Sequence, residues 1–319
     1  MMQRIRMAVA TVPTPLAGLA LGLGSLGWCW EYAADFSGRV QQAGAGIAGC
    51  LLLVLLLKFL LQPRLLRQDL AHPVMGSVLP TFAMGWMVVS VSLPVSVAVP
   101  LWLAALLLHL GFLLGFVWHR LQDLQLPLMI PGWFVPPVGI ITAVVTCPQP
   151  AFSTLVQGIF WFGLICYSLL LPLMLFRLLF AGAVPDGAKP TIAVLAAPAS
   201  LALAGYLSIA EPSGLLVAIL LGIALLMTAL IYLSLILLLN LPFTPGFAAY
   251  TFPLVISATA LFKVSLLLSG NGAVAEAGWL HGLAIFELLV ATAVTFYVCI
   301  RYAGYFWELY SERVLIPIS

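Results

Sequence analysis

Long apolar stretches recur along the whole chain, and each is close to the roughly 20 residues that a helix needs to cross a bilayer core. Leu, Ala, Val and Ile fill these stretches, while Pro, Gly and charged clusters interrupt them. The pattern predicts ten helices. They begin near Val12, Ala43, Val74, Val97, Trp133, Phe152, Thr191, Leu215, Ala248 and Trp279. The fifth is the weakest, because prolines delay its start and Pro148 stops it early.

The composition supports this interpretation. Of the 319 residues, 64% are hydrophobic and only 7% are charged, whereas about 25% are charged in an ordinary soluble domain. A soluble globular protein is therefore excluded, and the fold class expected is an all-α integral membrane protein with a single transmembrane domain, residues 1–319. The formal net charge of +2 is small and the basic residues are scattered, so nucleic acid is not expected as a partner.

Positive charge is unevenly distributed between the two sides of the membrane. In a ten-helix topology one side carries ten of the twelve basic residues, namely Arg4, Arg6, Lys58, Arg64, Arg67, Arg120, Arg177, Lys189, Arg301 and Arg313. The other side carries Arg39 together with several acidic residues. Cytoplasmic loops are rich in Lys and Arg. We therefore expect a multi-pass protein of the bacterial inner membrane with both termini in the cytoplasm.

A proline recurs at matched positions in the odd-numbered helices. These prolines are spaced 65, 57, 61 and 55 residues apart, at Pro15, Pro80, Pro137, Pro198 and Pro253. Each interval is one hairpin of two helices, and the hairpins cover about 12–61, 74–118, 133–180, 191–239 and 248–306. Proline inside a helix frees a backbone carbonyl that hydrocarbon does not tolerate. We therefore expect the odd helices to be kinked and to face inward.

Side-chain size alternates in the same way. Small and hydroxyl residues follow each proline, whereas the even helices contain leucine runs such as 51–57 and 235–239. Small residues allow helices to approach closely, and leucine is stable against lipid. The pattern predicts an inner ring of five kinked helices within an outer ring of five, around a pore lined mainly by hydroxyls and backbone. The alternative is that these prolines and small residues serve helix packing alone.

Few residues could carry chemistry. No His, Cys, Asp or Glu cluster has metal-ligand spacing, no nucleophile has a neighbouring base, and no glycine-rich phosphate loop is present. We expect no enzyme activity, no catalytic residue, no metal and no cofactor. The ionisable residues within helices are His109, Lys263 and Glu287. His109 is expected to be packed and neutral, and Lys263 either pairs with Glu287 or places positive charge at the outer mouth.

The sign of the charges favours anions. The inner helices contain no Asp or Glu away from their ends, and the cytoplasmic ends are basic. A pore with hydroxyl donors and no carboxylate disfavours cations and admits anions. Small anions are therefore the expected partners, together with the lipid bilayer.

Short motifs then resemble a known family. The segment 250–254, Tyr-Thr-Phe-Pro-Leu, and the small-residue run that continues to Lys263 are similar to the ninth helix of the tellurite-resistance and C4-dicarboxylate transporter family, which includes the slow anion channels of plant guard cells. His72-Pro73 and the segment 15–18 are similar to other parts of that family. The likeness extends over essentially the full chain in length, helix number and proline spacing.

The resemblance implies quasi-fivefold symmetry around the pore, assembly as a homotrimer, and a pore plugged by a phenylalanine, which matches Phe252 here. The residue before a proline is disfavoured in the α conformation, which is consistent with a side chain held across a bore. The leading hypothesis is an anion channel for chloride, nitrate and possible organic anions. The alternative is a proton-coupled transporter of C4-dicarboxylates or related anions, including sulfite or tellurite export, with Glu287 as the titrating group.

Overall fold

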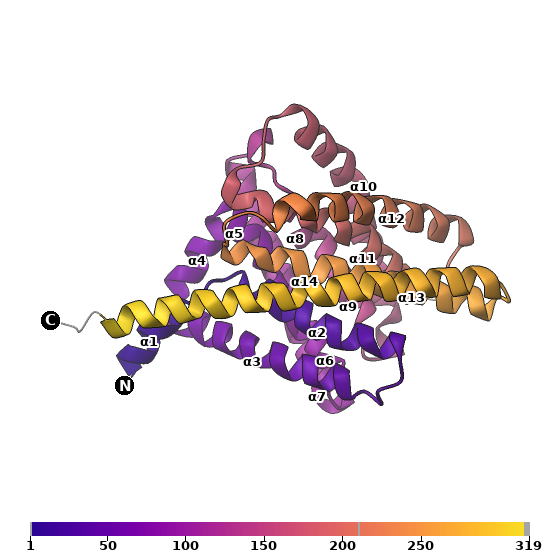
Figure 1. The fold of residues 1–319 in the computed structure, drawn as a ribbon, viewed down its shortest axis with the longest axis horizontal. Helices are drawn as coiled ribbons and strands as arrows, with labels where there is room; N and C mark the ends of the chain where they lie inside the picture. Colours follow the sequence, from indigo (N-terminus) through magenta and orange to yellow (C-terminus); the bar gives the residue numbers. More distant parts are fainter. Residues whose placement is uncertain (1, 210, 316–319) are drawn as a thin grey trace.

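The computed structural model describes residues 2–209 and 211–315, which form α-helices and short 3-10 helices (Figure 1). The α-helices are α1 (Met2–Ala10), α2 (Leu16–Ala33), α3 (Arg39–Leu61), α4 (Pro63–Ala71), α5 (Pro73–Val78), α6 (Thr81–Ser90), α7 (Val95–Gln122), α8 (Val135–Val138), α9 (Thr142–Val145), α10 (Ser153–Phe180), α11 (Ala197–Tyr206), α12 (Gly214–Leu238), α13 (Thr251–Gly270) and α14 (Val274–Leu315). The 3-10 helices are η1 (Leu126–Leu128), η2 (Pro131–Phe134), η3 (Gly139–Ile141), η4 (Pro150–Phe152), η5 (Asp186–Ala196) and η6 (Pro245–Tyr250).

Eight helical segments of the described chain are long and apolar enough to cross a membrane. These segments confirm an integral membrane protein made of helices. Two expected helices fall outside this set. The helix α2 has 18 residues and includes Trp28, Trp30 and Glu31, and the segment Pro131–Val145 is a shorter apolar helix broken into short pieces. The sequence predicts the weakness of this second segment, because its prolines interrupt the backbone hydrogen bonds.

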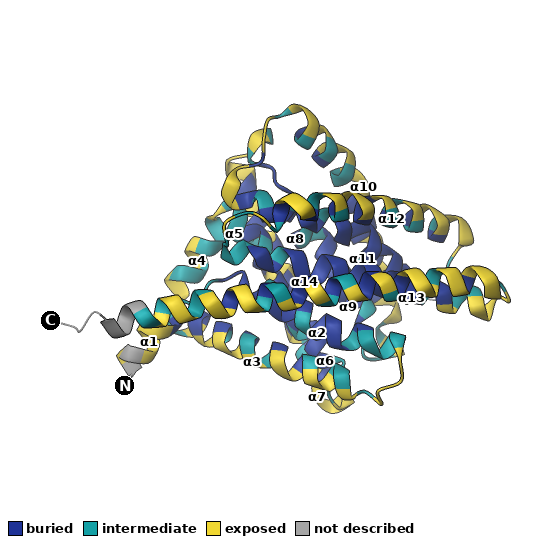
Figure 2. Ribbon diagram, viewed as in Figure 1, coloured by how far each residue is buried: buried dark blue, intermediate teal, exposed yellow. Residues whose placement is uncertain are grey.

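Burial separates the segments into two classes (Figure 2). In α3, α7, α10, α12 and α14 only 28–39% of the most apolar window is buried, against 67–83% in the segments Pro73–Ser90, Asp186–Tyr206 and Pro245–Gly270. Leucines on the first class are widely exposed, for example Leu107 at 69% and Leu237 at 75%. A surface of exposed leucine side chains is favourable in contact with hydrocarbon and unfavourable in contact with water. These helices therefore form the outer, lipid-facing layer, as the leucine runs predict.

The more buried segments form a closed ring. Helix α2 packs against α6, α6 against α9, α9 against α11, α11 against α13, and α13 returns to α2. Each inner segment is also followed in the chain by an outer helix, and several such pairs pack directly, as α2 does with α3 and α13 with α14. This alternation of inner and outer segments is what five consecutive hairpins would give, and the five hairpins stay a prediction.

The prolines lie at the junctions between helical pieces and not in the middle of helices. Pro15 and Pro80 precede the first residues of α2 and α6, Pro198 lies in the first turn of α11 and Pro253 in that of α13. Pro137 lies in the four-residue helix α8. Pro80, Pro198 and Pro253 thus lie where two helical pieces join within one inner segment, and the expectation that the five prolines kink pore-lining helices stays a prediction. Proline has no N–H, and the first turn is the place where a helix does not require that N–H.

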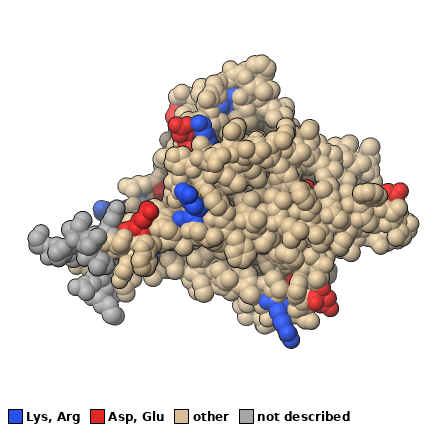
Figure 3. All heavy atoms as spheres, viewed as in Figure 1, with Lys and Arg blue, Asp and Glu red and all other residues tan. Residues whose placement is uncertain are grey.

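Both ends of the described chain lie at the same end of the molecule: α1 and the C-terminal part of α14 are both at the left of Figure 1. On the face drawn in Figure 3, charged side chains are few and a broad uncharged surface covers the middle of the molecule. This surface is the expected counterpart of the bilayer core.

Helix α2 approaches α13 so closely that Gly22 has no room for a side chain. A Cβ atom at Gly22 would lie 2.5 Å from the Cβ of Thr251 and 3.2 Å from the backbone nitrogen of Phe252. Gly22→Ala is therefore expected to destabilise the protein by about 1–3 kcal/mol, which is typical of overpacking in a tight core. The measurement is the melting temperature of the purified protein in detergent.

The matched control for this prediction is Gly46→Ala. Gly46 lies in α3, and a Cβ atom there would meet nothing within 4 Å. The control is expected to leave the melting temperature unchanged or slightly raised, because Ala favours helix more than Gly does. Equal melting temperatures for the two variants would contradict the close packing of α2 against α13.

Candidate functional site

A cavity of about 300 Å³ lies inside the ring of inner segments. We call it the wide cavity. Its walls come from residues 15–21, 74–84, 134–138, 187–201 and 244–253, which lie in or directly before the five inner segments. None of the described residues that line it belongs to the outer helices α3, α7, α10, α12 or α14. The inner ring therefore encloses the cavity, which the alternation of small and leucine-rich segments predicts.

The wide cavity is more apolar than the sequence leads one to expect. Its lining includes Val, Met, Leu and Phe, and its hydroxyls are those of Thr81, Thr191 and Thr244. Of the five prolines expected at the pore, Pro15, Pro198 and Pro253 line this cavity, whereas Pro80 and Pro137 are not among its lining residues. Thr81 and Thr191 donate their hydroxyls to carbonyl oxygens of their own segments, at 2.7 Å and 2.6 Å. The expectation of a bore lined mainly by hydroxyls and backbone is therefore corrected for this half. The physical reason is that a threonine hydroxyl can donate to the backbone carbonyl oxygen three residues before it in the chain. A hydroxyl that is bonded in this way has no hydrogen left to donate into the cavity.

A second cavity, of about 20 Å³, lies further along the same segments. We call it the narrow cavity. It is lined by Ser25, Trp28, Val88, Thr142, Val145, Thr146, Leu201, Phe252, Ile256 and Thr259, and all of these belong to inner segments or follow them directly. Four of the ten carry hydroxyls. The hydroxyl lining predicted from the sequence is therefore concentrated here.

The order of lining residues shows that the five inner segments run in the same direction. In α2, residues 15–21 line the wide cavity and residues 25–28 the narrow one. In three other segments, too, the earlier residues line the wide cavity and the later ones line the narrow cavity. These pairs are 74–84 and Val88, 134–138 and 142–146, and 244–253 and 256–259. All five segments therefore begin at the wide cavity, which is the end where α1 lies (Figure 1).

Phe252 lines both cavities. Only Leu201 among the other described lining residues is shared in this way. Phe252 is 7% exposed and immediately precedes Pro253 in the first turn of α13. Its ring therefore lies at the boundary between the wide and the narrow cavity, at the position that the family resemblance assigns to a plug.

Three further residues extend from Phe252 along one face of α13: Ile256, Thr259 and Lys263. Ile256 and Thr259 line the narrow cavity, and residues spaced three or four apart share a helix face. The Lys263 ammonium donates to Ser208 Oγ at 2.6 Å and to the Ala204 carbonyl oxygen at 3.4 Å. Lys263 thus lies one turn beyond the narrow cavity, on the side away from the wide cavity.

The expected ion pair between Lys263 and Glu287 does not form within the described residues. Lys263 faces α11, where it bonds Ser208, whereas Glu287 is 2% exposed and lies beside Ser257 on another face of α13. Thr228 and Ser257 are hydrogen-bonded there at 2.8 Å. The pairing prediction is wrong because the two side chains lie on different sides of α13. Glu287 lines neither cavity.

His109 is fully buried in α7 and packs against the broken inner segment Pro131–Val145. Its Nε2 lies 2.9 Å from the Pro136 carbonyl oxygen. Because a carbonyl oxygen only accepts, Nε2 donates the hydrogen bond. The packed histidine expected from the sequence is confirmed, and its role is to satisfy a carbonyl next to consecutive prolines.

The basic residues that the sequence analysis assigns to the cytoplasmic side are absent from the described lining of the wide cavity, which corrects the expectation of a basic mouth. Arg120 donates to the Ala71 carbonyl oxygen at 2.6 Å, and Arg177 donates to those of Gly182 and Pro127 at 2.8 Å and 2.9 Å. Both arginines are buried. Their charge is therefore used to satisfy backbone carbonyls in the connecting loops, where no helical partner is present.

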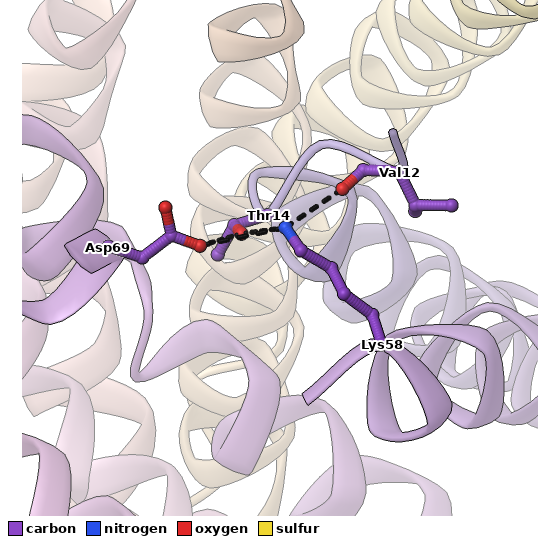
Figure 4. A network of polar contacts seen from close by, with 4 residues as sticks. All are labelled: Val12, Thr14, Lys58 and Asp69. Carbon is purple, nitrogen blue, oxygen red and sulfur yellow. Dashed lines mark hydrogen bonds and ion pairs between the residues drawn. The ribbon is translucent and has the colours of Figure 1, made fainter. Parts of the chain in front are cut away.

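Lys58 organises a further polar network at this end (Figure 4). Its ammonium donates to the Val12 carbonyl oxygen at 2.9 Å and to Thr14 Oγ1 at 2.8 Å, and lies 3.6 Å from the Asp69 carboxylate. The Thr14 hydroxyl also donates to Asp69. The network connects α3, α4 and the loop directly before Pro15, whose side chain lines the wide cavity. Sequence analysis missed it, because its members come from three separate segments.

A family model described as voltage-dependent anion channel matches residues 12–303. The chain belongs to the voltage-dependent anion channel family. This membership confirms the resemblance drawn from the Phe252 segment and the proline spacing. Members of this family are channels or transporters, so anion transport and not catalysis is the activity to expect. No match to the chain was found among curated proteins.

Proposed function

We propose that the chain is an anion channel of the bacterial inner membrane, with a path that follows the axis of the five inner segments and is closed by Phe252. The observation that carries this proposal is the position of Phe252, whose ring is shared by the wide and the narrow cavity. A hydrophobic constriction closes a pore by excluding water and thereby raising the cost of ion entry. Small movements of one ring would therefore open or close the path.

We further infer ten membrane crossings, because α2 and the broken segment Pro131–Val145 line the same cavities as the longer inner segments. An even number of crossings agrees with α1 and the end of α14 lying at one end of the molecule (Figure 1). Both ends are assigned to the cytoplasm on the distribution of Lys and Arg. Quasi-fivefold symmetry and a homotrimer with one pore per protomer are part of the same proposal.

The substrates proposed are small inorganic anions such as chloride and nitrate, with organic anions as further candidates. No Asp or Glu among the described residues lines either cavity, and Lys263 supplies positive charge beyond the narrow one. Both features lower the energy of an anion relative to a cation. The test is electrical recording from purified protein in a planar bilayer, with chloride, nitrate, sulfite and malate compared.

The same recording distinguishes a channel from the proton-coupled transporter of C4-dicarboxylates, sulfite or tellurite. A channel current reverses with voltage and ignores a pH gradient, whereas a coupled carrier is driven by that gradient. Coupling requires a titratable group that changes exposure. Glu287, the residue the sequence offers for this role, lies outside both cavities, which favours the channel.

Lys263→Gln is expected to lower anion conductance roughly two- to threefold at low ionic strength, because the ammonium concentrates anions at the outer side of the path. At high salt the difference is expected to vanish, since mobile ions screen the charge. Lys263→Arg keeps the charge and is the matched control. Equal reductions at low and high salt would show that Lys263 acts through packing and not through its charge.

A further inference from the structure

Two residues that line the narrow cavity carry buried hydroxyls with no hydrogen-bond partner within the described part of the chain. They are Ser25 Oγ on α2 and Thr142 Oγ1 on α9. The two residues are 7% and 2% exposed. A buried hydroxyl without a partner is unfavourable, and native proteins normally supply one. The partner of these two hydroxyls is therefore expected to be a species that occupies the narrow cavity.

The other hydroxyls of this cavity already donate to the protein. Thr259 Oγ1 donates to the Val255 carbonyl oxygen at 3.0 Å. Thr146 Oγ1 donates to the Thr142 carbonyl oxygen at 2.7 Å and accepts from Trp102 Nε1 at 3.2 Å. A hydroxyl has one hydrogen to donate. The free donors are therefore those of Ser25 and Thr142, which come from different segments of the ring.

The size and charge of the surroundings define the occupant. The volume of about 20 Å³ corresponds to roughly one water-sized species, since a cavity of about 10–15 Å³ on this measure already holds a water. No carboxylate is present among the described lining residues, and Lys263 lies one helical turn beyond Thr259. Two O–H donors in a lining without carboxylates favour an anion over a cation.

We propose that Ser25 and Thr142 form a binding site for one small, dehydrated inorganic anion of halide size, immediately beyond Phe252. The inference rests on the proposed anion conduction and names the anion class that the site selects. Larger polyatomic anions such as sulfate or a dicarboxylate do not fit the volume. An anion in this site is held by two hydroxyls and no fixed cation, so its binding is weak enough to allow release, as conduction requires.

The direct test is crystallography of the wild-type protein with bromide, whose anomalous scattering identifies it. A bromide peak within hydrogen-bonding distance of both Ser25 Oγ and Thr142 Oγ1 is expected, and the peak should be lost in the Ser25→Ala/Thr142→Val variant. A cavity that holds only water in the wild type, or a peak that survives in the double variant, would overturn the site.

The functional test uses the Phe252→Ala background, in which the proposed plug is absent. There, Ser25→Ala and Thr142→Val are each expected to raise the half-saturating chloride concentration by about fivefold, which corresponds to about 1 kcal/mol of binding. Ser234→Ala is the matched control, since its hydroxyl on α12 donates to the Leu230 carbonyl oxygen and Ser234 lines neither cavity, and it should leave this concentration unchanged.

The outcomes separate the two proposals. If Phe252→Ala conducts anions but Ser25→Ala and Thr142→Val behave like Ser234→Ala, the binding site is rejected and the channel stands. If correctly folded Phe252→Ala passes no anions, the channel proposal fails, and the site fails with it unless bromide is found there in the crystal.

Discussion

Phe252→Ala is expected to raise anion conductance at least about tenfold, which corresponds to a barrier lowered by about 1.4 kcal/mol. Phe252 is the bulky residue shared by the wide and the narrow cavity, and removal of its ring would join the two. A continuous path that holds water lowers the dehydration cost that an ion meets at an apolar constriction. The measurement is single-channel or macroscopic current in planar bilayers with symmetric chloride.

Two further variants make this prediction specific. Phe252→Leu keeps part of the bulk and should give an intermediate conductance. Phe286→Ala removes a phenylalanine that is 54% exposed on the outer helix α14 and should leave the current unchanged. If the purified Phe252→Ala protein is monodisperse and conducts no more than the wild type, Phe252 does not close the path.

The second large effect concerns stability. Asp69→Asn is expected to lower the free energy of unfolding by about 3 kcal/mol, at the lower end of the cost of breaking a buried ion pair. The Lys58 side chain is 6% exposed and would keep its charge without the carboxylate, whereas the 23% exposure of Asp69 moderates the loss. The melting temperature in detergent, followed by tryptophan fluorescence, should fall accordingly.

The chain offers a matched control for this experiment. Asp186 and Lys189 form an ion pair at 2.6 Å, but the Asp186 side chain is 91% exposed. Exposed pairs contribute little to stability, so Asp186→Asn should leave the melting temperature unchanged. If both variants melted at the same temperature as the wild type, the network in Figure 4 would not stabilise the junction of α3, α4 and the loop before α2.

The general organisation could be predicted from the sequence because it depends on patterns that repeat. Proline spacing and the alternation of small-residue with leucine-rich segments predict which segments lie inside, and the cyclic contacts and burial agree. The same pattern did not predict where each proline lies within its helix. A proline at a helix start and one at a kink look alike in sequence, since both interrupt an apolar stretch.

The site was predictable only in part, because side-chain direction around a helix is not visible in composition. The placement of Lys263 required knowing which face of α13 turns toward α11, where Ser208 accepts its hydrogen bond. The hydroxyls of the inner segments were expected along the whole bore, but among the described lining residues the unpartnered ones are Ser25 and Thr142 at the narrow cavity and Thr244 at the wide one. The role of Phe252 came from the family resemblance and remains a prediction.

The common direction of the five inner segments has an electrostatic consequence. The aligned peptide dipoles of an α-helix place roughly +0.5 elementary charge at its N-terminal end, and the α-helices α2, α6, α11 and α13 all begin beside residues that line the wide cavity. The backbone alone therefore generates a positive potential at a mouth whose side chains are almost entirely uncharged. An anion that approaches this mouth is attracted by the peptide groups themselves, without a basic residue that would hold it too tightly to release.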